Sequence, residues 1–314
     1  GVWTLDQAAN YNKQGIWPTA GSIDPLLGDV AIIFSTTASN LGIEFQNITS
    51  GGNAAEFGDL STTAGSNQSA LGNSVYALVA GDYTVDIYYV TYASTGNTAS
   101  WGDLYTSSGL TANCANSVRG LIFGNAQDSN SSVQYLSLAS QGNSADFGDV
   151  LYVGTYLQQG MACSSPTRGV TAGGYSANAG APSYSIANIT YVTIATTGNT
   201  TDFGNLSVGR RFGASSSSNT RIVWVAGYTN DTSYQNVMDY ITTASTGNAT
   251  DFGDLAVSTR RLGGTGNSTK GTFYGGDGGS GVVNTISTIT IASTGNSTDY
   301  GDLTVAQDCN ATSN

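Results

Sequence analysis

The sequence contains no histidine, and this absence removes several classes of chemistry at once. Without an imidazole there is no Ser-His-Asp or Cys-His catalytic arrangement, and the histidine ligands that copper and zinc sites favour are missing. Of the 21 acidic residues only Glu44 and Glu56 are glutamates, and we interpret the acidic side chains as turn residues and surface charges rather than a catalytic pair. We therefore expect a protein that is not an enzyme and that binds no cofactor and no metal ion.

Basic residues and long apolar runs are also scarce. Nine Lys and Arg stand against 21 Asp and Glu, which gives a formal net charge of −12. Because phosphate groups are bound mainly by Lys and Arg, this balance argues against a nucleic-acid partner. No apolar run approaches the roughly 20 residues that span a bilayer, so we expect no membrane insertion.

A repeated ten-residue phrase dominates what is present. Residues 246–255 read TGNATDFGDL, and residues 294–303 read TGNSTDYGDL. The phrase, with its Gly-Asn pair, occurs in six copies at intervals of 44 to 56 residues, and in each copy the pair leads to an aromatic residue, a Gly, an Asp or Asn, and a Leu or Val. The pairs begin at Gly52, Gly96, Gly142, Gly198, Gly247 and Gly295. This period, with strand-like content, is typical of four-stranded propeller blades.

Each copy of the phrase follows two strand-like segments. The first is short and apolar and usually ends in Gly, as in VYALVAG and RIVWVAG, and the second is mixed, as in YLSLAS and STITIAS. We interpret the phrase as the third strand and the stretch after it, such as LAVSTRR, as the fourth. The aromatic residue is predicted to fill the wedge between blades, Thr-Gly-Asn to form the turn, and the Asp carboxylate to accept backbone hydrogen bonds.

This order resembles the kelch repeat. The matching features are an apolar strand ending in Tyr274-Gly275-Gly276, the turn at Gly295-Asn296, and Tyr300 ahead of Gly-Asp-Leu. The resemblance covers roughly residues 28–314, with Asn205 in place of the Asp in one copy. The wording of the repeat and the opening GVWTLDQAANYNKQGIWP also resemble repeat proteins of marine bacteriophages and other environmental viruses, which are regarded as tail or fibre components. That resemblance implies a virion surface protein.

The expected fold is therefore all-β, a six-bladed kelch-like propeller over residues 28–314 with an N-terminal arm over residues 1–27. The first blade lacks one strand, and the C-terminal tail supplies a candidate. We expect residues 304–311 to pair with a strand near residues 30–36 and to close the ring. In the arm, the capping-box pattern at Thr4 predicts a short helix flanked by Trp3 and Trp17. The arm either packs on its own propeller or anchors in another subunit.

Two sets of residues recur at fixed phases of the repeat. Cys114 and Cys163 stand five residues before an arginine, and Ser216 and Thr265 hold the same place in later copies. Because this phase accepts any small residue, we interpret these cysteines and Cys309 as buried packing thiols. The recurring arginines are interpreted as salt bridges and caps at blade ends, with a cationic binding ring as the alternative.

The longest interval, from Asn143 to Asn199, predicts protruding loops that bind a partner. We expect contact residues at Tyr152, Tyr156, Tyr175 and Tyr184. Eleven Asn-X-Ser/Thr motifs are candidate N-glycosylation sites: Asn47, Asn67, Asn130, Asn188, Asn199, Asn205, Asn230, Asn248, Asn267, Asn296 and Asn310.

Three functions fit these observations. The first is a non-enzymatic structural protein of a virion surface, such as a tail, fibre or capsid-attached propeller, with loops for attachment to a host. The second is an adhesin that binds cell-surface glycans, which aromatic residues on loops would favour. The third is a glycosylated subunit of a secreted extracellular filament. All three place the protein on a virion or outside the cell, in an oligomeric assembly with other virion or filament subunits.

Overall fold

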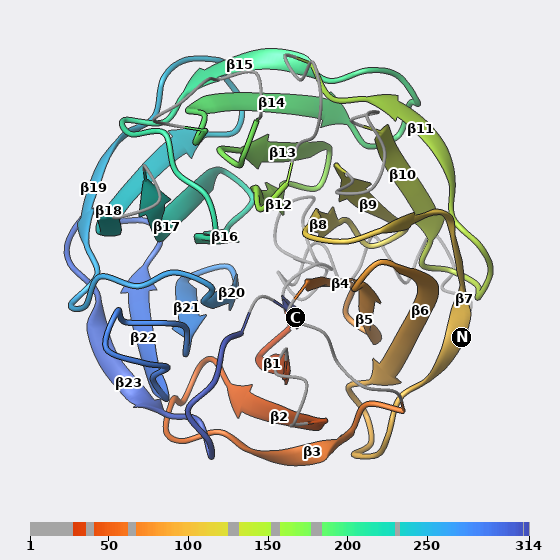
Figure 1. Ribbon diagram of the computed structural model, residues 1–314, viewed down its shortest axis with the longest axis horizontal. Helices are drawn as coiled ribbons and strands as arrows, with labels where there is room; N and C mark the ends of the chain where they lie inside the picture. Colours follow the sequence, from red (N-terminus) through yellow and green to blue (C-terminus); the bar gives the residue numbers. More distant parts are fainter. Residues whose placement is uncertain are drawn as a thin grey trace, which may run out of the picture.

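A computed structural model shows a closed ring of six antiparallel sheets around a central axis (Figure 1). The structure describes residues 28–35, 41–61, 67–124, 132–151, 158–176, 184–229, 233–309 and 311–313. Within these ranges every regular element is a strand, which confirms the predicted all-β, six-bladed propeller, and no helix there is long and apolar enough to cross a membrane. The predicted arm, with its helix, Trp3 and Trp17, lies outside the described residues.

Each blade has four strands, and their order runs from the axis outward. Blade I contains β24 (Ala311–Ser313), β1 (Val30–Phe34), β2 (Gly42–Asn47) and β3 (Ala55–Asp59). Blade II contains β4 (Gln68–Gly72), β5 (Tyr76–Gly81), β6 (Thr84–Thr91) and β7 (Ala99–Ser108). Blade III contains β8 (Ala112–Ala115), β9 (Arg119–Phe123), β10 (Ser132–Ser137) and β11 (Ala145–Asp149).

The remaining three blades repeat this order. Blade IV contains β12 (Met161–Ser164), β13 (Arg168–Ala172), β14 (Asn188–Thr193) and β15 (Thr201–Asn205). Blade V contains β16 (Ala214–Ser217), β17 (Arg221–Thr229), β18 (Ser233–Thr242) and β19 (Thr250–Asp254). Blade VI contains β20 (Gly263–Gly266), β21 (Lys270–Tyr274), β22 (Thr285–Thr290) and β23 (Thr298–Asp302).

The strand order corrects the predicted phase of the repeat. The phrase forms the outermost, fourth strand of each blade, not the third, and the stretch after it crosses to the axis and begins the next blade. Because neighbouring strands are antiparallel, the Gly-Asn turns lie at one end of the ring, which we call the turn face. The crossing segments and the connections between second and third strands lie at the other end, which we call the loop face.

Pairing between the two ends of the chain closes the ring, as predicted. In blade I, β24 pairs antiparallel with β1, with Ile32 opposite Ser313 and Phe34 opposite Ala311. The pairing strand is Ala311–Ser313 rather than residues 304–311, because Gln307 to Cys309 are still part of the crossing segment from blade VI. The prediction was right in topology and placed the closing strand too early in the chain.

The aromatic residues of the phrase pack between blades, as predicted. Six buried clusters form the core, and each joins the facing sides of two neighbouring blades. Trp101 of blade II, for example, packs with Ile122 and Leu136 of blade III. Burying one such side chain contributes on the order of 1.5–3 kcal/mol. The core is therefore a ring of six equivalent wedges.

Every seam between blades carries the same three hydrogen bonds. At the seam of blades II and III, the Gly142 N–H donates to Trp101 O (3.1 Å), the Asp103 N–H to Asn143 Oδ1 (3.0 Å), and the Ser144 N–H to Asp103 O (2.8 Å). The equivalent Asn accepts the same bond at the other five seams. The predicted role of the Asp carboxylate is wrong: it is exposed, and the backbone N–H of that residue makes the contact.

Candidate functional site

Additional bridges on the loop face of blades IV to VI position a group of aromatic and charged side chains. The crossing segment that enters each of these blades pairs with a residue at or just beyond the end of that blade's second strand, as Arg211 does with Tyr228 and Arg260 with Asp277. The corresponding bridge of blade IV joins Gln158 to Tyr175. Because successive blades repeat the bridge, side chains from one blade contact those from the next.

These side chains form a continuous row, which we call the tyrosine–arginine strip. Its members are Tyr175, Tyr184, Arg211, Tyr228, Tyr234, Arg260 and Asp277. The Arg211 guanidinium lies 5.0 Å from the ring centroid of Tyr175 and 5.9 Å from that of Tyr228. The Arg260 guanidinium follows, 4.7 Å from the Tyr228 centroid and 5.1 Å from that of Tyr234. Rings and guanidinium groups therefore alternate across three blades, with cation–π attraction at each step.

Asp277 fixes one end of the strip. Its Oδ2 accepts hydrogen bonds from Arg260 Nε (3.0 Å) and the Tyr234 hydroxyl (2.9 Å), and its Oδ1 accepts one from the Gly279 N–H (2.9 Å). Partial burial acts to raise the pKa of Asp277, but the Gly279 N–H, the Tyr234 hydroxyl and Arg260 together hold it below its usual value. The carboxylate is therefore ionised at neutral pH and holds both partners in place.

The side chains of the strip remain partly exposed to solvent although their contacts with one another fix their positions. The side chains of Arg260 and Asp277 are 23% and 20% exposed, and all four tyrosines are half-buried. Burial lowers the pKa of the Arg211 guanidinium, and the nearby Tyr175 and Tyr228 offset only part of this effect. Flat rings and fixed charged groups thus share one surface, where a ligand can contact both kinds of group.

The other recurring arginines have structural roles. Arg210 is fully buried and pairs with Asp239, with Nη1 and Oδ2 2.6 Å apart. Arg119 Nη1 donates to Ile194 O of the next blade (2.8 Å), and its guanidinium lies over its own blade's Tyr135. Arg168, Arg221 and Lys270 make equivalent bonds. These four side chains cap carbonyl groups at blade ends, as predicted. Their acceptors are carbonyl oxygens, so these bonds are not the predicted salt bridges.

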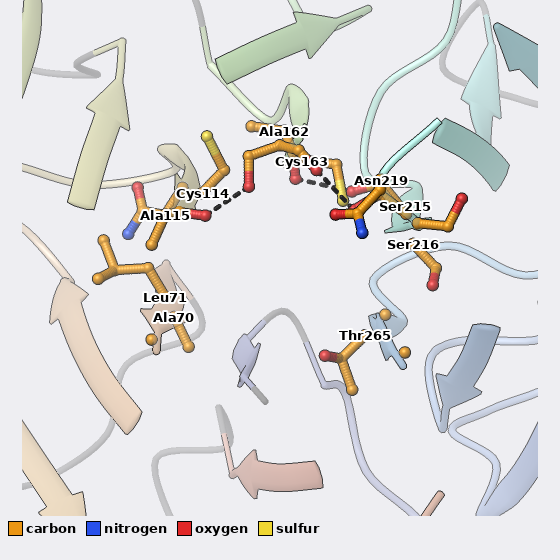
Figure 2. Close-up of a pocket in the computed structure, with 17 residues that line it drawn as sticks. Ala70, Leu71, Cys114, Ala115, Ala162, Cys163, Ser215, Ser216, Asn219 and Thr265 are labelled. Atoms are coloured by element: carbon orange, nitrogen blue, oxygen red, sulfur yellow. Dashed lines mark hydrogen bonds between the residues drawn. The ribbon is translucent and has the colours of Figure 1, made fainter. Parts of the chain in front are cut away.

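A pocket in the central channel is lined by the innermost strands of blades II to VI (Figure 2). Its cavity, of about 80 Å³, compares with roughly 300–1,000 Å³ for typical ligand pockets. Side chains of one strand bond the edge carbonyls of the previous strand, as Ser215 Oγ does with Ala162 O and Ser217 Oγ with Ser164 O. These bonds cover strand edges that would otherwise be open to other chains.

The cysteines border this channel or the core. Cys114 and Cys309 are buried, and Cys163 is half-buried. Burial raises the pKa of the Cys114 thiol, with a further contribution from Cys163, and burial also raises the pKa of Cys309. For Cys163 burial raises the pKa and hydrogen bonds with Ser217 and Ser215 partly offset it. The thiols are therefore protonated at neutral pH, in agreement with packing roles.

The predicted contact residues divide into two groups. Tyr175 and Tyr184 lie together, with ring centroids 5.2 Å apart and planes tilted by 31°, at the blade IV end of the strip. Tyr152 and Tyr156 lie outside the described residues. The sequence reasoning missed Tyr228, Tyr234 and Asp277. A usable signal was present, because Tyr175, Tyr228 and Asp277 each follow the Gly that ends the second-strand motif.

The glycosylation motifs differ in accessibility. Asn47, Asn199, Asn205, Asn248 and Asn296 are exposed, whereas Asn67 and Asn188 are half-buried. Asn267 is buried, and its Nδ2 donates to Asp29 and Thr49. Asn130, Asn230 and Asn310 lie outside the described residues. At Asn199, Asn248 and Asn296 the Oδ1 holds a seam, which leaves the nitrogen that an N-linked sugar would occupy.

Comparison with known proteins gives no relative from which a function can be taken. No protein-family model matches the sequence, and no curated protein matches it significantly. The fold and the geometry of the loop face therefore carry the functional argument, and what they establish directly is a six-bladed β-propeller.

Proposed function

We propose that this propeller is a non-enzymatic attachment protein displayed on the surface of a virion, with its loop face toward the host. The observation that carries the proposal is the difference between its two faces. The turn face repeats one turn with the same seam bonds six times, whereas the loop face of blades IV to VI carries the tyrosine–arginine strip. A uniform face suits a structural role and a variable face suits recognition, since binding residues concentrate on loops held by a rigid scaffold.

The chemistry of the chain supports a binding role over catalysis. The sequence has no histidine, and among the described residues no three Cys, Asp or Glu side chains form a group that could hold a metal ion. The virion assignment rests on the resemblance of the repeat and of the opening residues to kelch-like proteins of environmental viruses. In this proposal the arm, with Trp3 and Trp17, joins the propeller to a neighbouring virion subunit.

The proposal is tested on native particles and cells from the source of the sequence. Gold-labelled antibodies against the purified propeller should decorate the particle surface, and the purified propeller should be retained on host cells and reduce adsorption of the particles. Unlabelled particles, or a propeller that neither stays on cells nor competes with particles, would contradict it. Turnover of a cell-surface substrate by the purified chain would show that the non-enzymatic assignment is wrong.

A glycosylated filament subunit is the second candidate, favoured by the exposed motifs at Asn199, Asn248 and Asn296. These asparagines lie at three consecutive seams, so sugars there would line one arc of the rim without breaking the seam bonds. Mass spectrometry of the native protein distinguishes the two candidates, because occupied sites are expected of a secreted filament and bare sites of a virion protein made in a bacterial cytoplasm.

A further inference from the structure

We propose that the tyrosine–arginine strip is an oligosaccharide-binding site, in which the rings of Tyr175 and Tyr184 stack on one sugar unit and the Arg260–Asp277 pair bonds the hydroxyl groups of another unit of the same chain. The inference rests on the proposed attachment function and names the class of ligand. It is carried by the coincidence, on one accessible surface, of flat apolar rings and a fixed pair of hydrogen-bonding groups.

The aromatic end of the strip suits the apolar face of a sugar ring. A pyranose presents C–H groups on its faces and hydroxyls around its edge, so it pairs with a side chain that has a flat apolar body and a polar tip, as Tyr does. The Tyr175 and Tyr184 rings are held 5.2 Å apart, and Tyr175 also contacts the Arg211 guanidinium. Rings that are already positioned lose little conformational entropy when a ligand binds.

The polar end of the strip suits neighbouring hydroxyl groups. Arg260 uses Nε and Nη2 to bond Asp277 Oδ2, both at 3.0 Å, and stacking on Tyr228 and Tyr234 fixes the plane of its guanidinium. A guanidinium has five N–H donors, and an ionised carboxylate accepts at several positions. Each sugar hydroxyl both donates and accepts, so a donor fork beside a carboxylate fits a pair of adjacent hydroxyls.

Stability alone does not account for the strip. A partly exposed ion pair contributes only about 0–1 kcal/mol to folding. The crossing segments that leave blades II and III follow the same path to the axis, with Gly109 and Gln158 at the positions of Arg211 and Arg260. Arginine is therefore not required for the crossing itself, and the stacked Arg and Tyr residues are particular to blades IV to VI.

Immobilised oligosaccharides of defined composition provide the test. Chito-, cello-, manno- and galacto-oligosaccharides and an acidic uronate series are probed with the full chain, and any binder is then titrated by calorimetry. Tyr175→Ala and Arg260→Lys should each weaken binding by about tenfold or more, the scale of a central contact residue. Tyr105→Ala is the matched control, because Tyr105 is 64% exposed on β7, the outermost strand of blade II, and lies outside the strip.

Three results would overturn the inference. The first is binding of no oligosaccharide in the panel, the second is unchanged affinity in both strip variants, and the third is an equal loss in Tyr105→Ala. Melting temperatures of the variants separate lost contacts from lost folding, and Arg260→Lys keeps the charge while removing the planar fork. A propeller that stays on host cells but binds no sugar would refute this inference and leave the attachment function standing.

Discussion

Alanine at either of two glycines with the same backbone conformation should cost very different amounts of stability. Gly96 and Gly102 have φ values of +156° and +158°, which residues with a side chain rarely adopt. A Cβ on Gly96 meets no atom within 4 Å, whereas a Cβ on Gly102 lies 2.5 Å from the C and O atoms of Gly142 in the next blade. Both substitutions therefore introduce the same backbone strain, and only Gly102→Ala pushes the seam apart.

The expected magnitudes follow from the seam geometry. Backbone strain at a glycine-only conformation costs on the order of 1–3 kcal/mol, and this sets the loss for Gly96→Ala. Relieving the Gly102 contact lengthens the three hydrogen bonds between blades II and III, each contributing about 1 kcal/mol, so Gly102→Ala should lose roughly 3 kcal/mol more. Gly58→Ala, where the clash occurs without a positive φ, should show the seam cost alone.

Equilibrium urea unfolding, followed by tryptophan fluorescence and circular dichroism, measures these differences. The two probes should give coincident transitions, because a closed ring is expected to lose its blades together. Losses for Gly96→Ala and Gly102→Ala that agree within about 0.5 kcal/mol, the usual tolerance for independent sites, would refute the seam argument. The cost would then come from the backbone conformation alone.

Four further outcomes are expected. Asp239→Asn should destabilise the fold by about 3–5 kcal/mol in urea unfolding, because it leaves the Arg210 charge buried without its partner, and replacing both by apolar residues should restore most of the loss. Truncation after Leu303 removes β24 and should lower the melting temperature of the whole ring in one cooperative step, whereas two separate transitions would mean that the blades unfold independently. With iodoacetamide at pH 8, Cys163 should react first among the three thiols, and all three should react fully only in denaturant. Asp277→Asn should lower the melting temperature at pH 7, and the difference should disappear as the pH falls through the lowered folded-state pKa of Asp277, since a carboxyl with a depressed pKa contributes stability only while it is ionised.

The repeat made the architecture readable from the sequence. Six copies of one phrase predicted six blades, and the missing strand of the first blade predicted closure by the tail. The phase was misread because the stretch after each phrase has strand-like residues, yet it crosses between blades, and nothing local distinguishes a crossing segment from a strand. The role of the phrase Asn was missed because its partner, the Asp N–H, belongs to the preceding blade.

Only some members of the strip could be predicted from the sequence, for a related reason. Tyr175 and Tyr184 could be identified because they border an insertion, and the arginine pairs Arg210-Arg211 and Arg260-Arg261 recur at one phase of the repeat. Their association depends on bridges that align one residue from each of three blades, so members that are in contact lie up to 43 residues apart in the chain. Likewise Glu44, interpreted as a surface charge, is buried, with its Oε2 accepting the Thr304 N–H from the crossing segment of blade VI.

Because the six seams are alike, whole blades of such a chain can be rearranged during evolution. Because the outer edge of every blade offers one glycine, two carbonyls and one N–H to the turn of its neighbour, any blade is a suitable neighbour for any other. A gene could therefore duplicate, delete or reorder whole blades without inventing a new interface. Only the curvature and the closing strand would limit the size of the ring, while each blade could diversify its own loops independently of the rest.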